Sequence, residues 1–190
     1  MDRAPGALPC IGVVLAGGQS RRMGRDKALL AWRGRPLIEH QIALLRDAGV
    51  ADVQISGYRP GYGGIDDLRT QAGPLAGLAG VAAALRDETE LLVVPVDMPR
   101  LQPALLHRLR VEEPRAACLR FAGEVLPLRL RLDARCREVL DRLLRSDKPR
   151  QRSLRALQQA LDAKEIPLHR GEATQLTDCN TPETWNEVVE

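Results

Sequence analysis

Two short, uninterrupted apolar runs constrain the fold more than any other feature of this chain. The first spans residues 11–16 and ends in Gly17-Gly18. The second lies in segment 90–96, is apolar from Leu91 to Val96 and is followed by Asp97. A strand with one face in water alternates apolar and polar residues, whereas a strand of a parallel sheet is buried on both faces and is apolar throughout. We therefore predict that both runs are buried parallel strands.

Helical patterns lie between these strands. Residues 36–49 begin with proline, end with glycine and carry apolar residues on one face, which is typical of an amphipathic helix. Residues 52–56 have the composition of a further strand, and a second helix is predicted to begin at Gly73. Gly77 and Gly80 in that helix would allow other backbone to approach it closely.

The alternation of strands and helices predicts an α/β fold. We expect a Rossmann-like, doubly wound and mainly parallel sheet with helices on both faces. Ligands of such sheets bind beyond the carboxyl ends of the strands, where Gly17, Ser56 and Asp97 stand in this chain. The sequence thus predicts one edge of the sheet as the functional edge.

The second half of the chain is less regular. Residues 116–121 and 125–132 are predicted to form a pair of strands, and Asp133 is predicted to cap a helix that follows. No repeat or low-complexity linker interrupts the 190 residues, so we expect a single domain over 1–190, with 1–9 as a flexible tail.

Composition excludes several classes of function. The chain has two Trp, two Tyr and one Phe, too few for a platform that stacks single-stranded nucleic acid. No apolar run reaches the ~20 residues of a membrane-spanning helix. The four cysteines lack the spacing of a zinc site or a disulfide framework, which favours a reducing cytoplasm. We therefore expect no nucleic-acid partner and no membrane.

Positive charge is concentrated in residues 100–155. This stretch holds 14 Arg and one Lys against seven acidic residues, a local net charge of +8. A solvated, arginine-rich helix face is the preferred interpretation, and a basic wall that faces a polyanion is the alternative.

A loop rich in glycine and cations begins where the first strand ends. Glycines at 17, 18 and 24 allow backbone N–H groups to turn toward an anion, and Arg21, Arg22, Arg25 and Lys27 add positive charge. The spacing fits neither the Walker loop nor the dinucleotide fingerprint. Lys27 is one of only three lysines beside 25 arginines, and a compact ammonium suits a phosphate.

Segment 15–27 matches the pattern L-A-G-G-x-S-x-R-M-G-x-D-K of small nucleotidyltransferases. Four more blocks follow in a fixed order: G-R-P-L at 34–37, G-P-L-A-G at 73–77, V-D-M-P at 96–99 and N-T-P-E at 180–183. With this ordered set the chain strongly resembles the molybdenum cofactor guanylyltransferase family.

That resemblance implies the fold of the nucleotide-diphospho-sugar transferases and a Mg²⁺-dependent reaction. GMP would be transferred from GTP to the terminal phosphate of molybdopterin, with or without its metal, and pyrophosphate would be released. Other proteins of cofactor assembly are further possible partners. The residues that the resemblance singles out are Arg22, Lys27 and Asp97 for catalysis; Leu15, Ala16, Gly17, Gly18, Lys27, Ser56, Asp66 and Asp97 for the nucleotide; Asp97 for the metal; and Asp178 and Asn180 for the acceptor.

Two positions depart from the family pattern. Ser56 stands where the family usually has Asn, and Asp178 replaces the first Asn of the usual N-x-N-T-P. Asp97 also has a structural alternative, because Asp often caps a helix and one is expected to begin near Pro99. Its place directly after a buried strand favours the metal.

Three other functions remain open at this stage. A cytidylyltransferase acting on the same pterin usually has Leu-Ala-Ala-Gly at the strand end, and Gly17 in this chain leaves room for a larger purine. A sugar-phosphate or alditol nucleotidyltransferase is a second alternative. The third is an adaptor that binds GTP without turnover.

Overall fold

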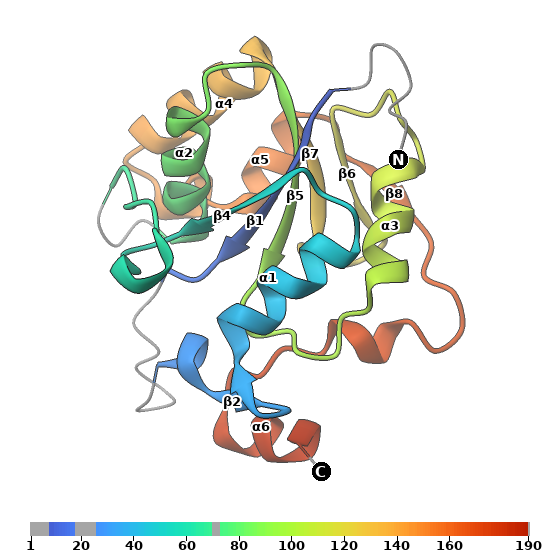
Figure 1. Ribbon diagram of the computed structural model, residues 1–190. Helices are drawn as coiled ribbons and strands as arrows, with labels where there is room; N and C mark the ends of the chain where they lie inside the picture. Colours follow the sequence, from blue (N-terminus) through green and yellow to red (C-terminus); the bar gives the residue numbers. More distant parts are fainter. Residues whose placement is uncertain (1–7, 18–25, 70–72, 190) are drawn as a thin grey trace.

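A six-stranded sheet forms the centre of the molecule (Figure 1). The computed structural model describes residues 8–17, 26–69 and 73–189. Residues 1–7 of the predicted tail therefore lie outside the described part. The strands stand in the order β4 (Asp52–Ser56), β1 (Cys10–Leu15), β5 (Thr89–Pro95), β7 (Leu128–Leu132), β6 (Cys118–Phe121) and β8 (Lys164–Ile166).

The central strand β1 pairs in parallel with β4 on one side and with β5 on the other. Strand β7 is antiparallel to both of its neighbours, and β6 and β8 are again parallel. The predicted fold class, a mainly parallel α/β sheet, is thus confirmed.

Helices cover both faces of the sheet (Figure 1). One apolar core lies against α1 (Leu37–Asp47) and α3 (Pro103–Val111). The other lies against α2 (Pro74–Ala84), α4 (Ala134–Arg145) and α5 (Leu154–Ala160). Helix α6 (Pro182–Val189) and the small hairpin of β2 (Ala31–Trp32) and β3 (Arg35–Pro36) lie beyond the end of β5.

Most predicted elements match the structure within a few residues. Asp133 caps α4 as expected, since its Oδ1 accepts from the backbone N of Cys136 at 2.9 Å. The small residues of α2 allow the expected close approach: a Cβ on Gly80 would lie 2.4 Å from the carbonyl oxygen of Asp66. The helix expected near Pro99 begins at Pro103 as α3, and the sequence patterns did not predict α5, β8 or the β2–β3 hairpin.

Arginines hold the carboxyl ends of the helices. Each of the six α-helices in the described part of the chain ends in carbonyl groups that accept a hydrogen bond from an arginine of another segment. The acceptors lie in the last turn of each helix or directly after it: Arg110 with Ala48 after α1, Arg137 with Ala82 of α2 and with Leu85 after it, Arg129 with Arg110 of α3 and with Glu112 after it, Arg69 with Leu144 of α4, Arg135 with Ala160 of α5, and Arg100 with Glu187 and Val188 of α6. A cation suits this position because the carbonyls at a helix C-terminus are unpaired and carry partial negative charge.

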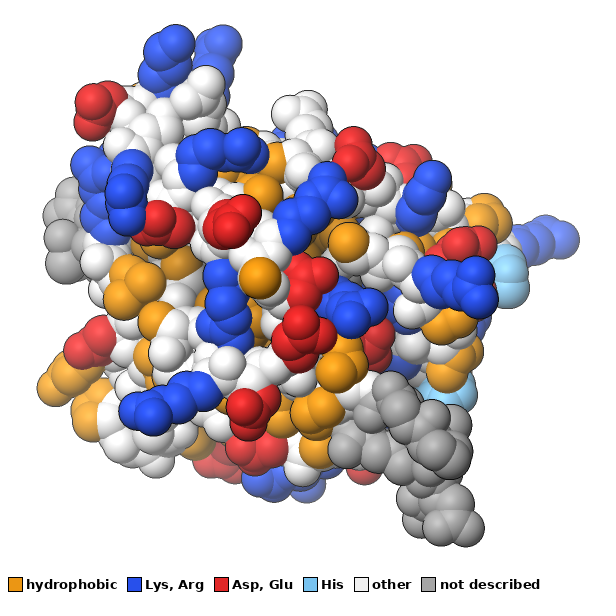
Figure 2. All heavy atoms as spheres, turned by 90° about the horizontal axis from the view of Figure 1, so that it is seen from above, with side chains coloured by type: hydrophobic (Ala, Val, Ile, Leu, Met, Phe, Trp, Pro, Cys, Tyr) orange, Lys and Arg blue, Asp and Glu red, His pale blue; other side chains and the backbone are white. Residues whose placement is uncertain are grey.

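The interpretation of residues 100–155 as a solvated face is therefore wrong for several of its arginines. Arg129 is the clearest case: it is 1% exposed, and its guanidinium donates to the carbonyls of Arg110, Glu112 and Glu113. Strand β7 has the sequence Leu-Arg-Leu-Arg-Leu, which suggests one wet face, but α3 covers that face at Arg129. Figure 2 shows, on the face seen from above, Lys and Arg side chains spread among Asp and Glu.

We expect Arg129→Ala to destabilise the fold by about 3 kcal/mol, because it leaves buried carbonyls without a donor. Arg131 lies two residues further along β7 and is exposed, so Arg131→Ala is the matched control and should change stability by less than about 0.5 kcal/mol. Urea unfolding of the wild type and both variants measures this difference. Equal midpoints for the two variants would contradict the assignment.

Candidate active site

The predicted site residues meet at the carboxyl edge of the sheet because β1 runs parallel to both neighbours. Leu15 lies opposite Ser56 of β4 and Pro95 of β5. The pairing continues past the strand ends, where Ala16 N donates to Ser56 O at 3.0 Å and Val96 N donates to Leu15 O at 3.2 Å. Ala16, Ser56 and the residue after Val96 are thereby held side by side.

Lys27 links three parts of the chain at this edge. Its Nζ lies 3.1 Å from Asp97 Oδ2 and also donates to Asn180 Oδ1. The two charged side chains are largely buried, with exposed fractions of 13% for Lys27 and 19% for Asp97. The structure thus brings together a predicted catalytic cation, the predicted metal ligand and a predicted acceptor-binding residue that lies 153 positions from the lysine.

Local structure positions Lys27 from its N-terminal side. It begins a 3₁₀ helix, η1 (Lys27–Leu29), and the preceding Asp26 caps that helix by accepting from Ala28 N at 3.0 Å. Because η1 packs on α1, the start of this short helix is fixed relative to the sheet.

Asp97 does not cap a helix. Helix α3 begins at Pro103, and its N-cap residue is Gln102, so the capping alternative from the sequence is wrong. The Asp97 carbonyl instead accepts from Cys179 N at 2.8 Å, which holds the segment around Asn180 beside the end of β5.

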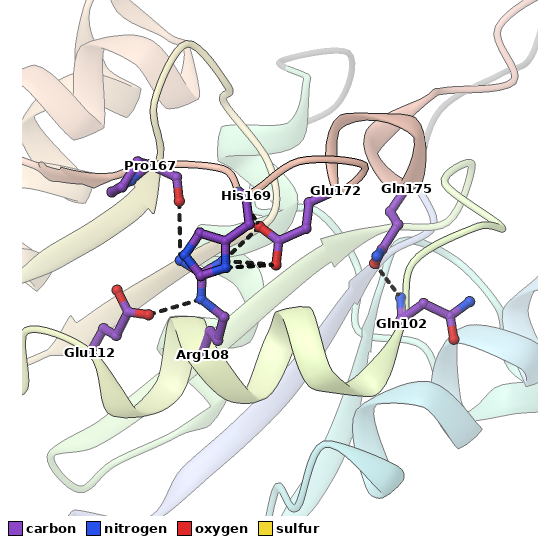
Figure 3. Close-up of polar contacts among 7 residues, drawn as sticks. All are labelled: Gln102, Arg108, Glu112, Pro167, His169, Glu172 and Gln175. Atoms are coloured by element: carbon purple, nitrogen blue, oxygen red, sulfur yellow. Dashed lines mark hydrogen bonds and ion pairs between the residues drawn. The ribbon is translucent and has the colours of Figure 1, made fainter.

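A network on α3 anchors the chain leading to this segment (Figure 3). Arg108 donates to both oxygens of Glu172 at 2.8 and 2.6 Å and to the carbonyl of Pro167 at 3.0 Å. Nearby, the backbone N of Gln102 donates to Gln175 Oε1 at 3.1 Å. Residues 167–175 are thereby fastened to α3, and the following residues are directed toward Asp97.

The remaining acceptor-side residue, Asp178, is exposed, whereas its neighbour Cys179 is fully buried. Burial, and to a lesser extent the carboxylates of Asp97 and Asp178, raises the pKa of Cys179 to about 11. The thiol is therefore protonated at neutral pH and does not act as a nucleophile.

On the other side of the site, glycines allow the ends of β1 and β4 and the start of α2 to pack closely together. Gly57 has φ +106°, and a Cβ there would lie 2.5 Å from Gly17 Cα. Ser56 is 2% exposed, and its Oγ would lie 2.1 Å from a Cβ on Gly77. These contacts require glycine and bring the β1 end, the β4 end and the first turn of α2 into direct contact.

Asp67, the neighbour of the predicted nucleotide-binding residue Asp66, faces the end of β1. Its two carboxylate oxygens lie 3.4 and 3.7 Å from the position of a Cβ on Gly17, and Oδ1 is buried without a hydrogen-bond partner among the described residues. Asp66, chosen from its seven-residue distance to the G-P-L-A-G block, is exposed. The two aspartates are adjacent, and spacing alone does not tell which of them faces inward.

Several expected residues lie outside the described part of the chain. These are Gly18, Arg22 and the neighbouring cations Arg21 and Arg25. Leu15 and Ala16 are buried at the end of β1, and Gly17 is exposed.

The side chains at this edge suit a metal ion that is coordinated mainly by substrate phosphates and water, with few ligands from the protein. Among the described residues, no three His, Cys, Asp or Glu side chains are grouped as a protein metal site would need. Asp97 supplies one carboxylate. Mg²⁺ is commonly held by one or two carboxylates together with phosphate oxygens and water.

The fold and the site define a nucleotidyltransferase, and comparisons with known proteins agree. A family model described as the MobA-like NTP transferase domain matches residues 12–164. The molybdenum cofactor guanylyltransferase of Xanthomonas euvesicatoria pv. vesicatoria is 49% identical over 95% of both chains. That of Pseudomonas aeruginosa strain PAO1 is 36% identical over 92% of both chains. The chain belongs to the MobA-like NTP transferase family and, within it, to the molybdenum cofactor guanylyltransferases.

Solved structures show the same fold. Molybdopterin-guanine dinucleotide biosynthesis protein A from Archaeoglobus fulgidus has a TM-score of 0.74 at 20% identity, covering 94% of this chain and 96% of that one. A 2-C-methyl-D-erythritol 4-phosphate cytidylyltransferase from Thermus thermophilus has a TM-score of 0.62 at 21% identity, covering 90% and 93%. The resemblance drawn from the sequence blocks, and the fold type that it implied, are confirmed. In the described part of the chain, no helix is long and apolar enough to span a membrane.

Asp67 gives a pH-dependent prediction. Burial, and to a lesser extent the Asp66 carboxylate, raises the pKa of Asp67. The folded chain therefore holds this proton more tightly than the unfolded chain, so stability is lost as the pH rises from the unfolded pKa, about 3.9, through the folded pKa. We expect Asp67→Asn to raise the Tm at pH 7, and this gain to shrink as the pH falls toward about 4.

Thermal melts across this pH range check the prediction. Asp66→Asn is the matched control, because an exposed side chain should change the Tm little at either pH. A gain from Asp67→Asn that is equal at both pH values would show that the carboxyl group is not the cause.

Proposed function

We propose that this protein transfers GMP from GTP to the terminal phosphate of molybdopterin, with or without its metal, and releases pyrophosphate. The observation that carries the proposal is the convergence of Lys27, Asp97 and Asn180 at the carboxyl edge of β1 and β5. Family membership supports molybdopterin as the acceptor and GTP as the nucleotide, and the three side chains offer charge and polar groups where the two substrates would meet.

The chemistry is an in-line displacement at the α-phosphorus of GTP. An oxygen of the acceptor phosphate forms the new bond to that phosphorus, and the bond to the bridging oxygen of the β-phosphate breaks, so that pyrophosphate leaves. A phosphate monoester is largely ionised at neutral pH, so no protein base or nucleophile is required. Catalysis then consists of positioning and charge stabilisation.

Lys27 is the residue suited to stabilise the leaving pyrophosphate. Its ammonium is compact and held between Asp97 and Asn180, so little reorganisation is needed as negative charge develops. We propose that Asp97 holds Mg²⁺, which when bound neutralises charge on the triphosphate. Asp178 and Asn180 are proposed for the acceptor, and Arg22 and Gly18 for the triphosphate.

We expect the guanine base of the bound GTP to lie over Gly17. Glycine at this position places no side chain against the Asp67 carboxylate, whose Oδ1 is buried without a partner among the described residues and whose oxygens lie 3.4 and 3.7 Å from where a methyl group would stand. Guanine offers its N1–H and its 2-amine as donors, and a carboxylate accepts both. This arrangement favours GTP over CTP. Ser56 and Asp66, which the resemblance assigns to the nucleotide, lie in the adjoining segments.

We also propose a cytoplasmic location. The four cysteines are free thiols buried in the fold, and a reducing compartment suits a protein that keeps all of them unpaired.

Release of pyrophosphate is the direct test of the function. We expect release from the wild type only with GTP, Mg²⁺ and molybdopterin together, and not with CTP, ATP or UTP. Lys27→Met and Asp97→Asn should each lower kcat by about 10² to 10³-fold. Lys148→Met and Asp87→Asn replace exposed residues of the same types and should leave the rate unchanged.

Other outcomes separate the alternatives. Turnover with CTP would establish a cytidylyltransferase, and turnover with a sugar phosphate in place of the pterin would establish the sugar-nucleotide alternative. GTP binding without turnover in the presence of molybdopterin would leave an adaptor.

Inosine triphosphate, which lacks the 2-amine of guanine, tests base recognition. We expect the wild type to favour GTP over ITP by about tenfold or more, and Asp67→Asn to remove that preference, because a hydrogen bond to a charged acceptor is lost. Asp66→Asn is the matched variant. Loss of the preference in Asp66→Asn but not in Asp67→Asn would assign recognition of the base to Asp66.

A further inference from the structure

Arg59 joins the end of β1 to the residue that precedes Lys27. Its Nε and Nη2 donate to the Ala16 carbonyl at 3.2 and 2.8 Å. Its Nη2 also donates to Asp26 Oδ1 at 2.9 Å, and its Nη1 donates to Asp26 Oδ2. One guanidinium therefore binds a backbone carbonyl and both oxygens of a carboxylate, a forked arrangement that lysine does not reproduce.

The backbone of Arg59 is itself fixed. It stands three residues after β4, and its carbonyl accepts from the backbone N of Tyr62 and of Gly64, both at 2.9 Å. Gly64 packs so closely on this turn that a Cβ would lie 2.7 Å from Arg59 N. The guanidinium is thus presented from a rigid turn, with 18% of its side chain exposed.

Asp26 connects Arg59 to the start of η1 and so to Lys27. The Oδ1 atom that accepts from Arg59 also accepts from Ala28 N, and so caps the helix η1 that begins at Lys27. Lys27 in turn contacts Asp97 and Asn180. A continuous set of contacts therefore runs from the carbonyl of Ala16, through Arg59 and Asp26, to the ammonium.

We propose that Arg59 is a positioning residue for Lys27: by holding Asp26 against the end of β1, it sets where the ammonium stands relative to the nucleotide. This inference rests on the proposed function of Lys27 as a phosphate-binding residue. Arg59 acts through Lys27, because the Nε, Nη1 and Nη2 atoms are all engaged with Ala16 and Asp26.

A double-mutant cycle with Lys27 tests this role. We expect Arg59→Ala to lower kcat/KM for the nucleotide by about 100-fold, the cost of a catalytic group misplaced by roughly 1 Å. In the Lys27→Met background the same substitution should have almost no further effect, because the group that it positions is already gone. Equal losses in both backgrounds would overturn the proposal, and so would full activity of Arg59→Ala.

Two further variants keep the test independent of folding. Arg59→Lys keeps the charge but not the fork, and Asp26→Asn keeps the shape of the partner but not its charge. We expect each to reproduce a loss of kcat/KM that disappears in the Lys27→Met background, while the Tm shows that the protein is folded. Arg86→Ala, an exposed arginine after α2, is the control and should retain wild-type activity.

The proposed function and this inference fail in different ways. Direct binding of ATP, CTP, GTP and UTP to the wild type identifies the nucleotide without an acceptor, and the cycle is then repeated as a binding measurement with that nucleotide. Preference for a nucleotide other than GTP would refute the proposed function and leave the cycle interpretable. Tight GTP binding that Arg59→Ala does not weaken would refute the positioning role alone.

Discussion

The parallel pairing of β1 with both β4 and β5 is the constraint on which the site depends. Parallel neighbours end at the same edge, so the residues after Leu15, Ser56 and Val96 must emerge together. The backbones of β1 and β4 then approach so closely that a Cβ at position 57 would collide with Gly17, and a Cβ at position 77 would collide with the Ser56 hydroxyl. The surface at this edge therefore consists of backbone groups and small residues, which suits a planar nucleotide base and a polyphosphate.

The sequence predicts this edge well because its signals are local. Continuous apolar runs identify β1 and β5. The motifs that follow these two strands in the sequence contain Gly17, Lys27 and Asp97. Elements whose burial comes from distant segments are harder to predict. Strand β7 has alternating arginines, and Arg129 is buried only because the end of α3 supplies carbonyl acceptors for it. No pattern within β7 specifies that partner.

The same distinction separates the predicted site residues from the missed ones. Lys27 and Asp97 are found from motifs, but the segment with Asn180, which Lys27 contacts, is held beside Asp97 by a hydrogen bond from Cys179 that only the fold shows. Asp66 and Asp67 are adjacent, and the choice between them depends on which side chain turns toward Gly17. Arg59 is one of 25 arginines, and its role follows from two partners that are 43 and 33 residues away.

The bias of this chain toward arginine gains a physical meaning from these contacts. A planar guanidinium with several donors can join two or three carbonyl or carboxylate oxygens at once, which is what the helix ends and the Ala16–Asp26 connection require. An ammonium is a compact charge with rotatable donors, and this chain places one at the point where Asp97 and Asn180 meet. Among the described residues, arginine therefore fixes much of the framework, and Lys27 occupies the position that we propose faces the phosphates of the substrate.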